Sequence, residues 1–258
     1  MQTVRVGSLE LGKGQPCIIV PLTSSALPDL LLEARDLASL PVDMAEWRVD
    51  MFGSGPVQEH EVLGALEQLK AVLPVPLLVT FRTCAEGGNR PLSPEAYASL
   101  CTALCRSRLP DLMDVEAFTD IRRAASLVAL AHDCGIPVVA SSHDFSATPP
   151  ENEIVRRLLS MQNDLDADVL KIAVMPASRA DVLTLLSATQ KACDLVSRPV
   201  ITMSMGPLGV ISRVCGQSFG SAATFGAARA ASAPGQMNVR DLHAVLAALQ
   251  AAGAGSVE

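Results

Sequence analysis

Lys171 is the residue whose type and surroundings point most directly to a chemical reaction. It is one of four lysines, against sixteen arginines, and it lies in the largely apolar run 168–175. Burial disfavours the charged form of an amine and lowers its pKa, and a neutral amine at neutral pH is the nucleophile that forms a Schiff base with a carbonyl compound. A lysine held in an ion pair inside the fold is the alternative interpretation.

A histidine ends the apolar run that precedes this lysine. His143 lies in the sequence Ser141-Ser-His-Asp-Phe145, and adjacent parallel strands lie about 4.8 Å apart, close enough for it to face the same substrate as Lys171. An imidazole at that place removes or delivers protons near neutral pH, or else it is a hydrogen-bonded packing residue. The order Ser142-His143-Asp144 is not evidence for a hydrolase triad, because triad members meet in space rather than as consecutive residues.

Charged side chains also gather at the ends of other apolar runs. These are Glu46 with Arg48, Arg82 followed by Glu86, Asp114 with Glu116, and Arg213. Three arginines around one opening suit an anionic or polyhydroxylated substrate, because the rigid guanidinium fork matches a carboxylate. The alternative is that the arginines only neutralise the carboxylates beside them.

Alternating strands and helices must position these side chains. Eight short apolar runs rich in β-forming residues have centres about 20 to 36 residues apart, the length of a strand-plus-helix unit. We expect strands at 17–22, 44–52, 77–82, 112–118, 138–143, 169–175, 200–205 and 219–225, and helices at 28–37, 58–72, 94–106, 120–134, 151–165, 179–196 and 239–252. Ser93 before Pro94 and Ser178 before Arg179 are typical helix-capping serines. The alternation predicts parallel strands with right-handed crossovers.

The pattern favours a closed barrel over an open doubly wound sheet. The units are evenly spaced, without a long insertion at a switch point, and several strands carry polar residues at alternate positions. Glu46, Arg48 and Asp50 share one face of the second strand, which suits a barrel interior with a polar upper end. Residues 4–6 and 9–11 predict a hairpin. We therefore expect one α/β domain over residues 1–258, a (β/α)8 TIM barrel with an N-terminal β-hairpin that closes its bottom.

The composition excludes several other classes of protein. With 49% apolar and 18% charged residues, the 258-residue chain can bury a full core, unlike a disordered or collagenous protein. The net charge of −7 is spread along the sequence, so no basic stripe is available to follow nucleic acid. No apolar run approaches the roughly 18 residues of a membrane span, and residues 1–14 lack the order of a secretory signal. We expect a cytoplasmic protein that binds neither nucleic acid nor membrane.

The cysteines and the glycine pairs give little support to a metal or nucleotide site. The seven cysteines are an odd number and lie mostly in apolar segments, which favours reduced thiols. Cys101 and Cys105 lie one helical turn apart, but no second pair or nearby histidine completes four ligands, so we expect core thiols. Gly12-x-Gly14 and Gly53-Ser-Gly55 lack the strand-to-helix context of a dinucleotide loop. No metal or organic cofactor is predicted.

Six short motifs gain their meaning from occurring together. They are Glu46-Trp-Arg-Val-Asp50, Thr80-Phe-Arg82 with Glu86-Gly-Gly88, Ser142-His-Asp-Phe145, Lys171-Ile-Ala-Val-Met-Pro176, Ile201-Thr-Met-Ser-Met205 and Ser232-Ala-Pro-Gly-Gln236. Together they resemble the type I 3-dehydroquinate dehydratase family, from about Val4 to the final helix. The resemblance implies a (β/α)8 barrel, usually a homodimer, that converts 3-dehydroquinate to 3-dehydroshikimate in the shikimate pathway without metal or organic cofactor.

The resemblance also implies a role for each matching residue. Lys171 would attack the C3 ketone to form an imine, His143 would remove the C2 proton while the C1 hydroxyl leaves as water, and Glu86 would orient His143. Arg213 would bind the substrate carboxylate. The remaining ligand contacts would come from Glu46, Arg48 and Arg82, which hold hydroxyls, and from Ser232 and Gln236, which close over the ligand in a lid formed by residues 230–238. The sequence departs from the family pattern at 23–27 and 206–209, which we expect to be loops at the mouth.

Two other functions fit part of this pattern. Another lysine-dependent barrel, such as a class I aldolase, would place a phosphate site after the last strands, where Gly220-Ser221 is a weak candidate. A non-catalytic barrel that senses a hydroxy acid would bind substrate without forming product. The conjunction of Lys171, His143 and Glu86 argues against the second, and Arg213 argues against the first.

Overall fold

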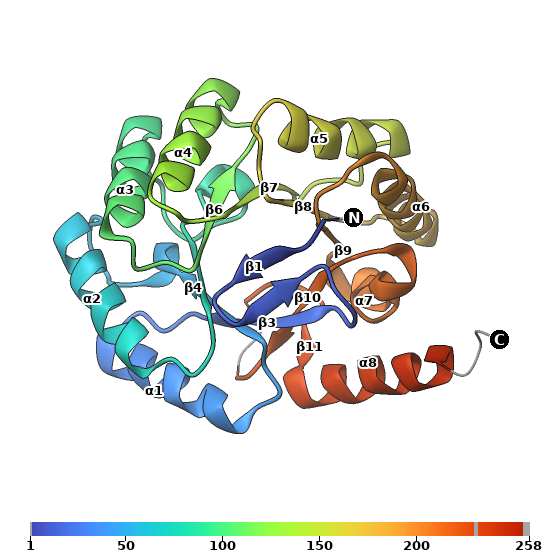
Figure 1. Ribbon diagram of the computed structural model, residues 1–258, viewed down its shortest axis with the longest axis horizontal. Helices are drawn as coiled ribbons and strands as arrows, with labels where there is room; N and C mark the ends of the chain where they lie inside the picture. The colour runs from blue at the N-terminus through green and yellow to red at the C-terminus, as the bar shows by residue number, and fades with distance from the viewer. Residues whose placement is uncertain (1, 230–231, 255–258) are drawn as a thin grey trace.

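Eight parallel strands form a closed barrel in the computed structural model, which describes residues 2–229 and 232–254 (Figure 1). The strands are β3 (Cys17–Leu22), β4 (Met44–Arg48), β5 (Leu77–Thr80), β6 (Leu112–Glu116), β7 (Val138–Asp144), β8 (Val169–Val174), β9 (Val200–Ser204) and β10 (Ala223–Ala227). From β3 to β9 each strand pairs with the next in chain order, β10 pairs with β3, and the short β11 (Met237–Asn238) pairs parallel with β10. The ring closes where the Ala222 amide donates to the Val200 carbonyl at 2.7 Å. The predicted (β/α)8 barrel is confirmed.

Helices surround the strands, as the sequence spacing predicts. They are α1 (Leu27–Asp36), α2 (Glu59–Val72), α3 (Pro94–Ser107), α4 (Ile121–Asp133), α5 (Glu151–Asn163), α6 (Arg179–Leu195), α7 (Gly206–Cys215) and α8 (Val239–Ala254), with short 3-10 turns η1 (Leu37–Ser39), η2 (Val49–Met51), η3 (Cys84–Glu86) and η4 (Gly216–Phe219). Both predicted caps are present: Ser93 accepts a hydrogen bond from the amide of Ala96, and Ser178 forms a capping box with Asp181.

Three regions differ most from the sequence prediction. Residues 206–209, expected to be a loop, begin α7, because Pro207 occupies the first turn, where a missing amide proton costs nothing. The second barrel strand ends at Arg48 rather than at 52, and η2 follows it. The last barrel strand begins at Ala223, since Phe219 belongs to η4.

Side chains that point into the barrel form layers of different chemistry. Successive residues of a strand alternate between its two faces, so one strand contributes every second residue to the interior. The lowest layer is apolar and contains Ile19, Met44, Leu78, Leu112, Val139, Val169 and Ile201, all buried in one cluster. Two residues further along the strands, the interior positions carry Glu46, Thr80, Asp114, Ser141 and Lys171. Two residues beyond those lie Arg48, Arg82, Glu116 and His143. The alternation therefore stacks a polar site directly on an apolar floor.

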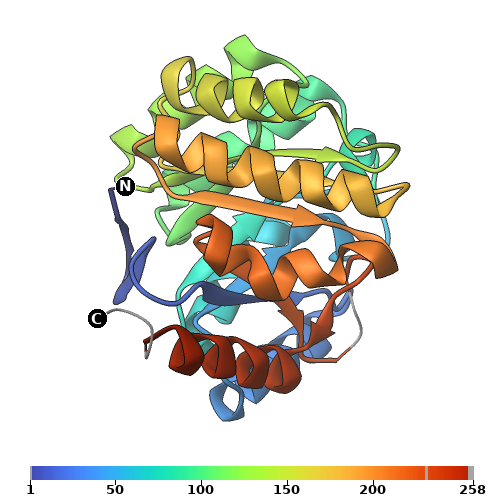
Figure 2. The ribbon, with the colours of Figure 1, turned by 90° about the vertical axis from the view of Figure 1, so that its right-hand side faces the viewer.

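The N-terminal hairpin closes the amino end of the barrel. Strands β1 (Val4–Val6) and β2 (Leu9–Leu11) pair antiparallel, and Val4, Val6 and Leu11 belong to the same buried cluster as the lowest interior layer. Figure 1 shows the hairpin lying across the barrel opening, and in the side view of Figure 2 the arrowhead of β9 points to the opposite end. The predicted closure of the barrel bottom is confirmed, and the open end holds the carboxyl ends of the strands.

Three aspartates complete the backbone hydrogen bonds at the amino end. Asp43, Asp111 and Asp168 each precede a strand, and each accepts a hydrogen bond at 2.8 Å from an amide near the start of the previous barrel strand: Ile18, Leu77 and Val138, respectively. A buried amide without a partner would cost free energy, so these carboxylates stabilise the ends of three strands.

In the part of the chain that the structure describes, every helix is too short or too polar to cross a membrane.

Candidate active site

All nine residues singled out for a substrate site line one cavity of about 230 Å³ at the carboxyl ends of the strands. They are Lys171, His143, Glu86, Glu46, Arg48, Arg82, Arg213, Ser232 and Gln236. Phe145, Met203, Met205 and Phe225 add apolar walls. Residues from five barrel strands, from the turn after β5, from η3, from α7 and from the segment after β10 therefore converge on one space.

Lys171 lies in the middle interior layer and is 4% exposed. Its Nζ is 3.8 Å from Glu46 Oε1 and 3.7 Å from Asp114 Oδ2, and it lies 4.5 Å from the centre of the Phe225 ring. Burial lowers the pKa of Lys171, and although the two carboxylates oppose this effect, the pKa stays below that of an ordinary lysine. Lys171 is therefore buried, as expected for a Schiff-base nucleophile, and is also flanked by carboxylates, as expected for a lysine in an ion pair.

His143 lies beside Lys171 and is held by Glu86. Ser141 pairs with Lys171 across β7 and β8, so His143, two residues on, shares the inner face one step nearer the mouth. Glu86 Oε2 lies 2.9 Å from His143 Nδ1 and also accepts the backbone amide of His143 at 3.1 Å. With Glu86 ionised, Nδ1 carries the proton and Nε2 is free to accept one.

Burial shifts both partners of this pair toward their neutral forms. It lowers the pKa of His143 well below its usual value, and the positive charges of Arg82, Lys171 and Arg48 act in the same direction. Burial also raises the pKa of Glu86, whereas Arg82 and the His143 amide favour its ionised form. The ionised carboxylate keeps the imidazole proton on Nδ1, so that the neutral His143 can take a proton from carbon through Nε2.

Arg82, just after β5, connects side chains of β6, β7 and η3. Its guanidinium donates to Asp114 at 2.8 Å, to Glu116 at 3.0 Å and to Ser141 at 3.0 Å, and it also lies 3.3 Å from Glu86. Burial alone would lower the pKa of Arg82, but the surrounding carboxylates raise it instead. Arg82 is thus a permanent charge that fixes its neighbours. The sequence placed Asp114 and Glu116 among the polar strand ends but did not single out Ser141, which looks like any small strand residue.

Arg48 is fixed in a similar way at the mouth. It forms a two-fold hydrogen bond to Asp50, with distances of 2.7 and 2.8 Å. Asp50 belongs to η2 rather than to the strand, so the prediction that Glu46, Arg48 and Asp50 share one strand face is wrong for Asp50. The turn folds the carboxylate back onto the guanidinium.

Arg213 differs from the other two arginines because no carboxylate neutralises it. It is 2% exposed, and none of the ion pairs among the described residues includes it. Its Nη2 donates to the Pro234 carbonyl at 3.0 Å, while its buried Nε has no hydrogen-bond partner in the described part of the chain. Burial lowers the pKa of Arg213 to about 10, which leaves it charged at neutral pH. A buried cation of this kind suits an anionic ligand.

Ser232 and Gln236 lie over the same cavity and bind each other. The Ser232 amide donates to Gln236 Oε1 at 2.8 Å, and Gln236 Nε2 donates to Ser232 Oγ at 3.0 Å. Between them, Gly235 has a φ of +79°, and a Cβ there would lie 2.5 Å from the Gly206 carbonyl oxygen, so only glycine fits. The predicted lid also includes Ala230 and Ala231, which lie outside the described residues.

Two segments noted in the sequence take no part in this cavity. Thr23 and Ser24, in the divergent segment 23–27, donate their amides to Glu33, and the segment does not line the cavity. Ser221 lies before β10, at the hairpin end of the barrel, where it accepts the Thr202 amide and donates to the Ala223 carbonyl. Gly220-Ser221 is therefore wrong as a phosphate site opposite Lys171, because it lies at the other end of the strands.

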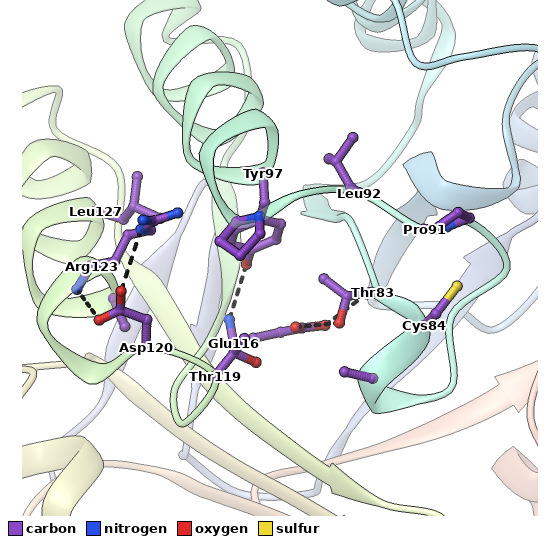
Figure 3. Close-up of a pocket in the computed structure, with 13 residues that line it drawn as sticks. Thr83, Cys84, Pro91, Leu92, Tyr97, Glu116, Thr119, Asp120, Arg123 and Leu127 are labelled. Atoms are coloured by element: carbon purple, nitrogen blue, oxygen red, sulfur yellow. Dashed lines mark hydrogen bonds and ion pairs between the residues drawn. The ribbon is translucent and has the colours of Figure 1, made fainter.

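A second cavity, of about 260 Å³, has Glu116 in its wall (Figure 3). Pro91, Leu92, Tyr97 and Leu127 line it, so its walls are largely apolar. Thr83 donates to Glu116, and Arg123 pairs with Asp120, while Nη1 of Arg123 has no hydrogen-bond partner among the described residues (Figure 3). The smaller cavity holds the lysine, the histidine and the unpaired arginine, and it is the candidate active site.

Cys101 and Cys105 are both buried in the hydrophobic core beneath α3, as predicted for core thiols. Burial raises the pKa of both thiols. Among the described residues, no group of three or more histidines, cysteines or acidic residues is arranged to hold a metal ion.

Comparisons with known proteins agree with this geometry. A sequence profile of the family described as type I 3-dehydroquinase matches residues 18–252. A 3-dehydroquinate dehydratase of Salmonella agona is 46% identical over 255 residues, covering 98% of this chain and 100% of that protein. The crystal structure of the type I 3-dehydroquinate dehydratase of Clostridium difficile with covalently modified comenic acid has a TM-score of 0.93 at 42% identity, covering 98% of this chain and 100% of that chain.

A more distant structure shares the fold alone. The phospho-2-dehydro-3-deoxyheptonate aldolase of Thermotoga maritima has a TM-score of 0.63 at 12% identity, covering 98% of this chain and 74% of that chain. Barrel shape by itself therefore does not distinguish the reactions, and the side chains inside the cavity do.

Proposed function

Since this chain belongs to the type I 3-dehydroquinase family, we propose that Lys171, His143 and Glu86 carry out its reaction through a Schiff base. The activity is that of a 3-dehydroquinate dehydratase, a hydro-lyase that removes water from 3-dehydroquinate to give 3-dehydroshikimate in the shikimate pathway. The family fixes the overall reaction, and the geometry of this cavity supports a role for each side chain.

The first step is imine formation at Lys171. The neutral amine attacks the C3 ketone of the substrate, a C–N bond forms, and the ketone oxygen leaves as water. The lowered pKa of Lys171 supports this step, because burial makes the neutral amine available at a pH where an exposed lysine is charged.

The second step is removal of water across C1 and C2. The protonated imine withdraws electrons from C2, so Nε2 of His143 can take the C2 proton and form an enamine. The enamine electrons then expel the C1 hydroxyl, which leaves as water with a proton returned by His143. Glu86 keeps the imidazole oriented throughout, and hydrolysis of the remaining imine releases the product and Lys171.

The other cavity residues bind the substrate. We assign the substrate carboxylate to Arg213, because it is the buried guanidinium that no carboxylate among the described residues neutralises. Glu46, Arg48 and Arg82 hold the hydroxyls, and Ser232 and Gln236 cover the ligand from the side of the cavity opposite the strands. No metal or organic cofactor takes part in these steps.

One observation carries these assignments: a buried lysine, an oriented neutral histidine and an unpaired arginine line the same cavity. Adding 3-dehydroquinate to the purified protein should produce the ultraviolet absorbance of a conjugated enoate. A protein that binds the compound without any absorbance change would be a hydroxy-acid-binding barrel, and the catalytic roles would be wrong.

We also propose that the protein is a homodimer. Leu183 on α6 and Leu208 and Ile211 on α7 are each more than 40% exposed on neighbouring helices, which supports a second copy covering this face. Analytical ultracentrifugation should give the mass of a dimer for the wild type and of a monomer for Ile211→Glu, and a monomeric wild type would contradict the assembly.

We further propose a cytoplasmic location and a single domain over residues 1–258. All seven thiols are free, which supports the cytoplasmic location.

A further inference from the structure

We propose that Asp114 is the carboxylate that holds Nζ of Lys171 and takes its proton before the amine attacks. This role lies beyond the residues assigned above, and it rests on the proposed Schiff-base chemistry. The supporting observation is that Oδ2 of Asp114, in the middle interior layer of the barrel, is buried without a hydrogen-bond partner among the described residues.

The two oxygens of Asp114 have different surroundings. Oδ1 accepts hydrogen bonds from Arg82 Nη2 at 2.8 Å and from Ser141 Oγ at 2.7 Å, so the side chain is fixed in one orientation. Oδ2 is buried and has no hydrogen-bond partner among the described residues, and it lies 3.7 Å from Lys171 Nζ. A buried carboxylate oxygen without a donor is costly, so an adjacent amine is its natural partner.

Glu46, the other carboxylate beside Lys171, is less suited to this role. Its Oε1, 3.8 Å from Nζ, already accepts a hydrogen bond from Thr80 Oγ1 at 2.9 Å. Its side chain is 5% exposed at the cavity, whereas that of Asp114 is 0% exposed behind the lysine. Glu46 therefore faces the ligand, and Asp114 faces only the lysine and its anchors.

Charged groups of both signs surround the amine of Lys171 and act in opposite directions on its proton. Burial and the positive charges of Arg82 and Arg48 make an ammonium unfavourable, while Glu46 and Asp114 favour it. The charged or titratable groups near Nζ are Glu46 and Arg48 on β4, Arg82 after β5, Glu86 in η3, Asp114 on β6, His143 on β7 and Arg213 on α7.

The proton of Lys171 moves to Asp114 and is used again when water leaves. In the transfer, one N–H bond of the ammonium breaks and one O–H bond forms at Oδ2, which leaves a neutral amine and a neutral acid. The amine adds to the ketone, and a proton moves from nitrogen to oxygen to give a neutral carbinolamine. Breaking its C–O bond to release water consumes one proton, which Asp114 supplies. Asp114 is then an anion again beside the cationic imine.

The test measures the protonation of Lys171 directly in the free enzyme. Trace acetylation with acetic anhydride at a series of pH values, followed by peptide mass analysis, gives the labelling midpoint of Lys171, with exposed Lys191 as the internal standard. Asp114→Asn removes the negative charge that favours the ammonium, so the midpoint should fall by about 1–3 pH units, the usual effect of one opposite charge at this distance. The rate of imine trapping by cyanoborohydride with 3-dehydroquinate should fall at least about tenfold, since proton transfer is lost.

Glu116→Gln is the matched control. Glu116 lies on the same strand and also pairs with Arg82, at 3.0 Å, but it forms no ion pair with Lys171. If Asp114 only supported Arg82, both variants would slow trapping and neither would move the Lys171 midpoint. An unmoved midpoint in Asp114→Asn, or an equal shift in Glu116→Gln, would overturn the proposal.

A second variant covers the case in which Asp114→Asn does not fold. Asp114→Glu keeps the charge and the arginine pair but displaces the carboxylate by one methylene. Its Lys171 midpoint should stay close to that of the wild type, and its trapping rate should fall at least about tenfold because proton transfer depends on position. An unchanged trapping rate would contradict the role of Asp114. Failure of the wild type itself to be trapped would instead refute the Schiff base, independently of Asp114.

Discussion

The two ends of the barrel treat buried polar groups in opposite ways. At the amino end, Asp43, Asp111 and Asp168 satisfy strand amides, and the hairpin seals an apolar layer. At the carboxyl end, Oδ2 of Asp114 and Nε of Arg213 are buried without hydrogen-bond partners in the described part of the chain. Unsatisfied buried groups are costly, and they persist at functional sites: Arg213 lines the cavity for a ligand, and Oδ2 of Asp114 lies beside the amine of Lys171. One end of the fold therefore supplies stability, and the other holds polar groups kept for binding and catalysis.

This contrast predicts that changes at the carboxyl end remove activity more than stability. Lys171→Met should give the largest effect, a loss of turnover of about 10⁴-fold or more, because it removes the covalent nucleophile. Its melting temperature should remain within a few degrees of the wild type, since Nζ lies 3.7–3.8 Å from the two carboxylates and Thr80 and Arg82 continue to donate hydrogen bonds to them. Steady-state assays and thermal melts measure the two quantities. Retained turnover would show that the lysine is structural.

Replacing the base should give the next largest effect. His143→Ala should lower kcat by about 10²- to 10⁴-fold, the usual contribution of general acid–base catalysis, with a much smaller change in substrate affinity. Single-turnover kinetics and ligand titration separate the two quantities. If the variant lost affinity but kept its turnover, His143 would be a binding residue and not the catalytic base.

Removing the unpaired cation should act mainly on binding. Arg213→Ala should weaken substrate binding by about 1.5–3 kcal/mol, the usual value of a hydrogen bond to a charged group, and this loss appears in KM. Replacing the substrate carboxylate by an ester should weaken binding to the wild type by a similar amount, because the contact with Arg213 is lost in both cases. If the ester and the acid bound the wild type equally well, Arg213 would not be the carboxylate site.

A change at the amino end should have the opposite signature. Asp168 accepts the Val138 amide and lies 2.8 Å from His132 Nε2, so Asp168→Asn should lower the free energy of unfolding by about 1–3 kcal/mol. Its kcat should be unchanged. The matched control is Asp166→Asn, which removes only an exposed partner of Arg198 at a position with φ of +54° that asparagine tolerates, and its effect should stay within about 0.5 kcal/mol. Equal effects from both, measured by urea unfolding, would refute the stabilising role of Asp168.

The sequence predicts the fold better than it predicts the contacts of the site. All eight barrel strands and seven of the eight helices follow from the repeated apolar runs, because burial enforces the alternation. Helix α7 is missed because two glycines and a proline within 206–209 are typical of loops, although proline is also favoured in a first helical turn.

The partners of Arg82 show what local pattern cannot supply. Asp114, Glu116 and Ser141 come from two other strands, and only the register of the closed barrel brings them to one guanidinium. Lys171 and His143 could be identified from residue type and position, whereas Glu86 depended on the family resemblance, since its turn after β5 has no local signature of function.

Chemical trapping of the imine tests the central role of Lys171 most directly. Sodium borohydride added together with 3-dehydroquinate should reduce the imine to a stable secondary amine and inactivate the enzyme. Peptide mapping by mass spectrometry should place the whole label on Lys171, and Lys171→Met should take up none. Label on Lys13, Lys70 or Lys191, or an active enzyme that takes up no label, would contradict the Schiff-base mechanism.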